Sequence, residues 1–384
     1  MESIEQMIKR LCPKGVEWKK ISEICVNICS GGTPSRGNSD YYSGNIPWLR
    51  TQEVNWTDVY DTELKISEEA VKNSSAKIIP SNCIIVAMYG ATAAKACINK
   101  IELTTNQACC NLQIDPGKAL YKYVYYWICN NYIKLKCLGE GSQNNLNAKK
   151  IKEYPIPIPP LEIQSRIVEV LDKMTTLTAE LEAELEARKQ QYEYYRNKLL
   201  TFNEIGGGIR QVTWKKISEI CIKVCSGRNK SKTEQGLYPV YGSTGIIGMC
   251  ESPVYNKRQI LVARVGANAG LVHLADGSYD VSDNTIIIDL SNDVNQKFVF
   301  YMLRNANLNK FAKGGGQPLL TATQIKDFVI PVPSMEEQQR IVSILDRFEA
   351  LTTDLQSGLP AEIEARRQQY EYYRNKLLTF DQAV

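Results

Sequence analysis

The chain has 384 residues, of which 43% are hydrophobic and 23% charged, with a formal net charge of +4. These values are ordinary for a globular protein of two or three domains. Its one histidine, His273, excludes multi-histidine metal sites and most histidine-based catalytic triads. No apolar run is long enough to span a bilayer, and the N-terminal MESIEQMIKR lacks the apolar core of a signal peptide. Twelve cysteines without an export signal predict reduced thiols in a cytoplasmic protein.

The chain begins with a predicted amphipathic helix over residues 1–17, which ends at Pro13–Gly15. A globular domain is expected over 18–157, with a strand at 77–88 and a helix at 121–132. Residues 158–202 predict a long helix after a proline-rich entry, and NEIGGGIRQV then predicts a flexible linker over 203–213. A second globular domain over 214–332, with a strand at 285–290 and a helix at 296–307, leads into a C-terminal helix over 333–384.

Both long helices carry the heptad pattern of a coiled coil. The first has an alternating three–four spacing, formed by Leu171, Met174, Thr178, Leu181, Leu185, Arg188, Tyr192, Tyr195, Leu199 and Phe202. The second keeps this pattern at Leu345, Phe348, Thr352 and Leu355, gains four residues, and resumes at Ile363, Arg366, Tyr370, Tyr373 and Leu377. Gly358 and Pro360 lie in the insertion and are expected to kink or break the helix.

The chain is an internal duplication. Residues 190–202 and 368–380 both read QQYEYYRNKLLTF, and WKKISEIC begins both globular segments, at Trp18 and Trp214. Further downstream, IIVAMYGATAA from Ile84 matches ILVARVGANAG from Ile260, an offset of 176. Each helix segment, 161–202 and 334–380, holds six basic and eight acidic side chains, so the rest of the chain carries a charge of +8. Positive charge in the globular parts favours a polyanionic ligand.

These repeats resemble the specificity subunits of Type I restriction–modification systems over nearly the whole chain. The motifs that carry the resemblance are IPIPPLEIQSRIV and IPVPSMEEQQRIV at the helix entries, the QYEYYRNKLLTF ends and the two Trp-initiated globules. The resemblance implies an α+β fold: two mixed α/β target recognition domains separated by two long antiparallel coiled-coil helices, with a pseudo-twofold internal repeat. Each domain would read one half of a bipartite, asymmetric site in double-stranded DNA.

In that family the helices set the spacer and dock two copies of the methylation subunit, and restriction subunits complete the complex. The subunit itself has no catalytic residue, cofactor or metal, because its partners bind S-adenosylmethionine and ATP. Tyrosine and arginine are typical interface anchors, and the repeat offers them twice. The residues expected to dock the partner are Tyr194, Arg196, Tyr372 and Arg374, whereas Tyr192 and Tyr195 on the heptad seam are expected to pack helix on helix.

Candidate DNA contacts lie in polar loops flanked by glycine, where amide and guanidinium groups suit base edges and phosphates. In the first domain they are Arg50, Thr51, Gln52, Tyr89, Thr92, Lys95, Gln143, Asn144, Asn145 and Asn147. In the second they are Arg228, Lys230, Lys232, Tyr241, Ser243, Thr244, Arg264, Asn268 and Gln317. An ordinary solvated loop is the alternative for each of them.

Several motifs are set aside. GGTPSRGNS lacks the lysine of a phosphate-binding loop, and NIPW departs from the Asn-Pro-Pro-aromatic motif of amino-methyltransferases at Ile46. The triplet Glu63-Leu64-Lys65 matches a nuclease pattern that is common by chance. The pairs Cys25/Cys29 and Cys221/Cys225 make incomplete zinc sites and are interpreted as structural cysteines.

Two other functions compete with a DNA-specificity subunit. The chain could be the specificity module of a self-sufficient modification enzyme, which labelled cofactor and purified protein would reveal as methyl transfer. It could also be a coiled-coil scaffold whose globules bind proteins. Salt-dependent binding to duplex DNA in the presence of the partner distinguishes these alternatives.

Overall fold

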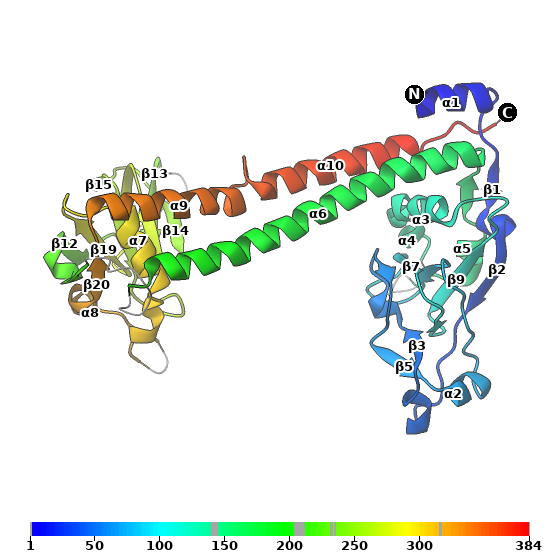
Figure 1. Cartoon of the computed structure of the whole chain (residues 1–384), viewed down its shortest axis with the longest axis horizontal. Helices are drawn as coiled ribbons and strands as arrows, with labels where there is room; N and C mark the ends of the chain where they lie inside the picture. The colour runs from blue at the N-terminus through cyan, green and yellow to red at the C-terminus, as the bar shows by residue number, and fades with distance from the viewer. Residues whose placement is uncertain are drawn as a thin grey trace. The chain divides into compact units, whose positions relative to one another are not determined.

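The computed structural model describes residues 2–139, 145–202, 212–230, 233, 236–314 and 317–383. The chain divides into two units, Met1–Glu180 with Ile363–Val384, and Leu181–Glu362. We call the globular part before α6 (Leu161–Leu200) domain 1, and the part between α6 and α9 (Met335–Thr353) domain 2 (Figure 1). Each unit therefore combines one domain, the start of the helix that leaves it, and the end of the other long helix.

Domain 1 is built on a five-stranded sheet of order β2-β9-β6-β7-β4 and a three-stranded sheet of order β5-β3-β8. The central strand β6 is buried at all four positions, so its branched side chains fill the core on both faces. It is shorter than the predicted strand 77–88, because Pro80 and Asn82, whose φ is 63°, precede it. The strands are β1 (Trp18–Lys20), β2 (Cys25–Ser30), β3 (Ile46–Leu49), β4 (Asp58–Val59), β5 (Leu64–Ile66), β6 (Ile84–Ala87), β7 (Ala96–Asn99), β8 (Thr104–Thr105), β9 (Cys109–Ile114) and β10 (Pro155–Pro157).

The helices of domain 1 begin at polar caps or cover the sheet. Ser3 and Gln6 form a capping box at the start of the first helix, and Asn147 caps the last one. The predicted helix 121–132 is confirmed as α3, which buries Tyr123, Val124 and Trp127, and a second short helix follows it. The helices are α1 (Ile4–Leu11), α2 (Glu68–Lys72), α3 (Tyr121–Asn130), α4 (Tyr132–Cys137) and α5 (Ala148–Lys152), with 3-10 helices η1 (Ile21–Ile24), η2 (Ser39–Tyr42) and η3 (Thr51–Glu53).

Domain 2 repeats this plan with a four-stranded sheet of order β12-β19-β16-β17 and a second sheet of order β14-β13-β18-β15. β13 pairs in parallel with β18, as β3 pairs with β8 in domain 1. The predicted strand at 285–290 and helix at 296–307 are confirmed. The strands are β11 (Thr213–Lys216), β12 (Cys221–Ser226), β13 (Tyr238–Gly242), β14 (Gly245–Cys250), β15 (Tyr255–Asn256), β16 (Gln259–Ala263), β17 (Val272–Ala275), β18 (Ser278–Val281), β19 (Thr285–Leu290) and β20 (Val329–Val332), and the helices are η4 (Ile217–Glu219), α7 (Gln296–Asn305), η5 (Leu308–Phe311) and α8 (Ala322–Asp327).

The same polar joint attaches each domain to the long helix that leaves it. Asp172 of α6 accepts hydrogen bonds from Tyr126 Oη at 2.6 Å and Lys122 Nζ at 2.5 Å. Asp346 of α9 accepts from Tyr301 Oη and Lys297 Nζ, both at 2.6 Å. Because charge-assisted bonds to two different side chains fix direction as well as distance, the joint sets the angle at which each helix departs.

The first long helix follows the predicted heptad seam, whereas Arg366 and Tyr373 of the seam predicted for the second are exposed. In α6, the seam residues from Leu171 to Tyr192 are buried or half-buried, whereas most of their neighbours are exposed. Leu378 joins the core of unit 1, beside Ile163 and Ile167 of α6, and Leu200 joins the core of unit 2. At about 1.5 Å per residue, the 40 residues of α6 extend roughly 60 Å.

The predicted break in the second long helix is confirmed. α9 ends at Thr353, and α10 (Leu359–Leu377) begins after five intervening residues. A Cβ atom on Gly358 would lie 2.6 Å from the Ala350 carbonyl oxygen, so this close approach requires glycine. The expectation that Leu355 lies on the seam is wrong: it falls in the break and is 80% exposed.

Candidate nucleic-acid interface

Four backbone hydrogen bonds hold the loops of domain 1 together at one edge of its sheets. They join segments that follow β2, β3, β6 and β8 and that precede α5. The donor and acceptor pairs are Gly32 N to Thr105 O (2.9 Å), Asn106 N to Leu49 O (3.0 Å), Met88 N to Ala108 O (2.8 Å) and Leu146 N to Met88 O (2.9 Å). Because these bonds use only main-chain atoms, the side chains they position are free to vary.

Domain 2 repeats the four bonds at equivalent positions. They are Arg228 N to Val281 O (3.1 Å), Ser282 N to Tyr241 O (2.8 Å), Arg264 N to Asn284 O (2.9 Å) and Leu320 N to Arg264 O (2.8 Å). We call each set of four bonds the loop frame. The two frames present different side chains at matching places, such as Met88 in domain 1 and Arg264 in domain 2.

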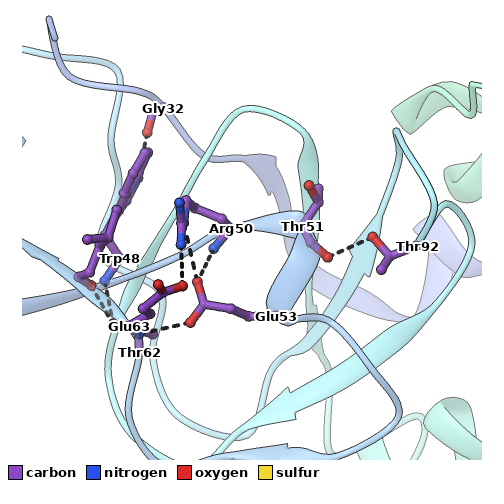
Figure 2. A network of polar contacts seen from close by, with 9 residues as sticks. Gly32, Trp48, Arg50, Thr51, Glu53, Thr62, Glu63 and Thr92 are labelled. Carbon is purple, nitrogen blue, oxygen red and sulfur yellow. Dashed lines mark hydrogen bonds and ion pairs between the residues drawn. The ribbon is translucent and has the colours of Figure 1, made fainter. Parts of the chain in front are cut away.

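Most predicted contacts of domain 1 that the structure describes are gathered at its frame. Thr92 Oγ1 donates to the Thr51 carbonyl at 2.7 Å, which ties the 88–95 loop to η3 (Figure 2). Lys95 Nζ donates to Asn55 Oδ1 at 2.7 Å, whereas Gln52 and Tyr89 are exposed. The Oδ1 atom of Asn147 accepts from Lys150 N at 2.9 Å, so this side chain is engaged as a helix cap. Asn145 is half-buried beside Leu146, and Gln143 and Asn144 lie outside the described residues.

Arg50 is held by two carboxylates at the end of β3. Its Nη2 lies 2.5 Å from Glu63 Oε2, and its Nε lies 3.6 Å from Glu53 Oε1 (Figure 2). Glu53 also accepts a hydrogen bond from the Glu63 amide at 2.9 Å, which fixes the two acids relative to each other. The Trp48 ring is anchored on the same strand, because its Nε1 donates to the Gly32 carbonyl at 3.0 Å. Arg50 is thus presented in one orientation, and its charge is balanced by its neighbours.

The predicted contacts of domain 2 lie around its own frame. Arg228, Lys230, Thr244 and Asn268 are exposed, Ser243 is half-buried in the β13–β14 turn, and Gln317 is exposed beside the segment that pairs with Val265. Arg264 Nη1 lies 3.5 Å from the Asp283 carbonyl. The ring of Tyr241 packs edge-on against Tyr279 at 5.4 Å, so it belongs to the domain core. Lys232 lies outside the described residues.

The segment on which each frame is centred was not among the contacts predicted from the sequence. Thr105 to Ala108 and Val281 to Asn284 each bond to three other loops, and they present Gln107, Asp283 and Asn284 at the same edge. The Gln107 and Thr33 side chains are also hydrogen-bonded to each other. The signal was a polar pair between two buried strands, at the same offset of 176 residues as the repeat from Ile84.

The residues predicted to dock a partner occupy matching places on α6 and α10. Tyr194 is 60% exposed and Tyr372 is 61% exposed. The guanidinium of Arg196 lies over the Tyr192 ring at 5.6 Å, and that of Arg374 lies over Tyr370 at 5.3 Å. Tyr192 lies near Phe348 of α9, with ring centroids 6.3 Å apart, in the helix-on-helix packing expected of it. Tyr195 also stacks on Phe348, at 5.8 Å.

The paired cysteines lie on β2 and β12 at the sheet edges. Burial raises the pKa of Cys25 to about 12, so its thiol stays protonated at neutral pH. Among the described residues, no cluster of three histidine, cysteine or acidic side chains is arranged to hold a metal ion. No helix in the described part of the chain is long and apolar enough to cross a membrane.

Each of the two domains has the same loop frame, and long helices join them. This architecture defines a class of protein. The sequence profile described as the Type I restriction modification DNA specificity domain matches this chain twice, over residues 13–189 and 210–365. The chain therefore belongs to the family of Type I restriction–modification specificity subunits.

The similarity between this chain and its relatives extends over most of their length. The chain is 30% identical to the Type I restriction enzyme EcoprrI specificity subunit of Escherichia coli, over 92% of this chain and 93% of that one. It is 35% identical to the EcoR124I/EcoR124II specificity subunit of Escherichia coli, over 69% and 72%. The fold matches the crystal structure of a Type I restriction-modification S subunit from M. genitalium with a TM-score of 0.60, 16% identity, and coverage of 95% and 96%. A role in DNA sequence specificity follows from this membership.

Proposed function

We propose that this chain is the non-catalytic specificity subunit of a Type I complex, in which each domain reads one half of a bipartite, asymmetric DNA site. The single observation that supports this most directly is the repeated loop frame. One main-chain scaffold presents two different sets of side chains, as two readers of different half-sites require. Adenine methylation and ATP-dependent restriction belong to the partner subunits.

In this proposal the frame residues contact DNA in two ways. Exposed basic side chains such as Arg228 and Lys230 contact phosphates and set the register. Side chains fixed by their neighbours read base edges, since a guanidinium held in one orientation can bond to two acceptors of guanine. Arg50 is the candidate of this kind in domain 1, together with Gln107, and Arg264 and Asn284 are the candidates in domain 2. The other predicted contacts that are exposed at the two frames belong to the same proposed surface, whereas Tyr241 packs into the core of domain 2.

The long helices set the spacer between the half-sites and dock two methylation subunits. Tyr194 and Tyr372 support this, because identical sequence with equal exposure provides two equivalent anchors for two copies of one protein. A spacer of about one duplex turn, ~34 Å, is expected between two such readers.

The test replaces one reading side chain and leaves the frame intact. Arg264→Met puts the side chain of domain 1 at the matching place in domain 2, and the frame bonds of residue 264 use only its main chain. Cells that express the chain with its methylation subunit would be compared by genome-wide mapping of adenine methylation. We expect one half of the motif to change or relax, since one lost base contact costs about 1–3 kcal/mol, and we expect the other half and the spacer to persist.

Gln107→Asp is the matched variant in domain 1 and should alter the opposite half of the motif. Retained assembly with the methylation subunit would show that each variant folds. A wild-type chain that directs no sequence-specific methylation would overturn the DNA-specificity role. If Arg264→Met and Gln107→Asp change the same half, independent reading by the two domains is wrong.

A further inference from the structure

The two domains differ at one edge of their larger sheets. The order β2-β9-β6-β7 in domain 1 matches β12-β19-β16-β17 in domain 2, but only domain 1 adds a further strand. That strand, β4, pairs in parallel with the outer edge of β7. Among the residues that the structure describes, no strand covers the outer edge of β17.

In domain 1, main-chain hydrogen bonds and an aromatic side chain hold β4 against the edge of β7. Trp56 N donates to the Ala96 carbonyl at 3.0 Å, and Lys100 N donates to the Val59 carbonyl at 2.8 Å. Tyr125 Oη donates to the Trp56 carbonyl at 2.7 Å, and the Trp56 ring lies edge-on to Tyr132 at 5.2 Å. The segment is therefore a short strand, β4, preceded by one large side chain that packs against α4, while α3 holds its main chain.

Domain 2 has the sheet edge and the helix that correspond to those contacting this segment in domain 1, but its described residues include no strand equivalent to β4. The strand registers place Val272 and Asp276 where Ala96 and Lys100 lie in domain 1, and Phe300 where Tyr125 lies. A cavity of about 500 Å³ opens beside this edge, between β17, α7 and α9, and its lining includes Leu271, Leu274, Phe300, Arg304 and Glu349. A cavity of this size accommodates an aromatic side chain, and an unpaired strand edge is a template for another strand.

We propose that the outer edge of β17 and this cavity receive an extended segment of the methylation subunit. The segment adds as a parallel strand, inserts an aromatic side chain into the cavity, and carries a basic residue opposite Asp276. The basic residue is inferred by comparing the two domains. In domain 1, Lys100 pairs with Asp58 of β4 at 3.3 Å, and at the position of Lys100 domain 2 has the negatively charged Asp276. Binding by strand addition is an established mode of peptide recognition.

The position of the cavity identifies which partner this is, and the inference therefore rests on the proposed function. Tyr192 of α6 lies near Arg304 and Glu349, which line the cavity, and the exposed Tyr194 follows it in the proposed docking surface. A methylation subunit docked on this end of α6 thus reaches β17. Because β4 already covers the equivalent edge in domain 1, only one of the two copies makes the contact, and the two copies bind with unequal affinity.

Hydrogen–deuterium exchange of the full-length chain, alone and with the methylation subunit, tests the proposal. Peptides over 271–276 should gain protection in the complex, whereas those over 96–100 should be protected in both states. Protection on α6 and α10 without any change at 271–276 would overturn this inference and leave the docking proposal standing. No change on the helices would overturn the docking proposal instead. Protection at 271–276 that requires DNA and not the methylation subunit would also overturn the inference.

A variant separates the strand contact from the nearby ion pair. Asp276→Pro removes the outward amide that corresponds to Lys100 N, together with the Asp276 pairing to Arg258. Arg258→Ala removes only that pairing and is the matched control. In titrations followed by native mass spectrometry, Asp276→Pro should weaken the binding of one of the two methylation subunits about tenfold. Arg258→Ala should weaken the binding of neither. Equal binding by Asp276→Pro and the unmodified chain would contradict the proposal.

Discussion

The segments 190–202 and 368–380 have the same thirteen residues in two different settings. Their outward faces are alike, because Tyr194 and Tyr372 are equally exposed. Their inward faces differ. Arg374 Nε donates to Asn130 Oδ1 at 3.1 Å, whereas Arg196 Nε is buried without a hydrogen-bond partner among the described residues.

The difference arises from the domains against which the two segments pack. In unit 2, Arg304 and Glu349 form an ion pair at 2.6 Å close to Tyr192. In unit 1 the equivalent positions are Cys129 and Thr175, and Tyr370 lies beside them. Identical sequence thus preserves the surface offered to a repeated partner, while each domain determines how firmly the segment is held.

Removing a buried leucine should show that each segment stabilises its own unit. Leu378 is 1% exposed in the core of unit 1, and Leu200 is 4% exposed in the core of unit 2. Leu378→Ala should lower the free energy of unfolding of unit 1 by about 3 kcal/mol, through lost burial and the cavity left behind. Four of the five tryptophans belong to unit 1, so fluorescence during urea denaturation reports on it. Leu200→Ala should leave that transition in place, and a shift of equal size would contradict the assignment.

Replacing an outward tyrosine should weaken partner binding and leave the fold unaffected. Tyr194→Ala and Tyr372→Ala should each weaken the binding of one methylation subunit about tenfold, because exposed tyrosines are frequent interface anchors. Titration of the methylation subunit by native mass spectrometry measures the affinity, and urea denaturation of the free chain provides the control. If only one substitution changes binding, the two outward faces are not equivalent.

The inward arginines should differ in their contributions to stability. Arg374→Ala should cost unit 1 about 1 kcal/mol, since it removes the bond to Asn130. Arg196→Ala should cost unit 2 less, because its Nε has no such partner. A double-mutant cycle with Asn130→Ala measures the Arg374 bond directly by urea denaturation. A coupling energy near zero would mean that the bond contributes nothing to the packing of the segment.

Much of the fold could be predicted from the sequence because its signals are local or repeated. Thirteen identical residues reveal the duplication, the heptad spacing reveals the seam, and Gly358 marks the break. Leu355 was placed on the seam because spacing alone does not show where the chain leaves the helix. The exit joints at Asp172 and Asp346 also went unpredicted, since their partners lie 45 to 50 residues away in the sequence.

The sequence identified the loops of the candidate site, but it did not show which of their side chains form its surface. Polar residues between glycines identified most segments of both frames. The sequence does not show that Glu63, set aside as part of a chance triplet, holds Arg50, because the contact depends on how β3 and β5 pair. It also does not show that Tyr241 packs inward on Tyr279. Burial and pairing, which are long-range properties, decide which polar loop residues remain available.

The smallest expected effect is a pH dependence that belongs to unit 2 alone. Burial, reinforced by the nearby charge of Arg304, lowers the pKa of His273 from its ordinary value of 6.5. Below about pH 6.5 the unfolded chain therefore binds a proton that the folded unit does not, so the stability of unit 2 falls as the pH decreases from there toward the lowered pKa. At the equivalent position in domain 1, Cys97 is a thiol whose pKa is raised by burial and which stays neutral throughout this range.

His273→Gln should remove this part of the pH dependence, and the chain has no other histidine to obscure it. The free energies of unfolding of unit 2, measured by hydrogen exchange between pH 7.5 and 5.5, should fall less steeply in the variant than in the unmodified chain. The difference in slope is at most about 1.4 kcal/mol per pH unit, the value for one proton. Unit 1 in the same samples provides the reference, because its slope should be unchanged by the substitution. Equal slopes for unit 2 in the two proteins would show that His273 titrates alike in the folded and unfolded states.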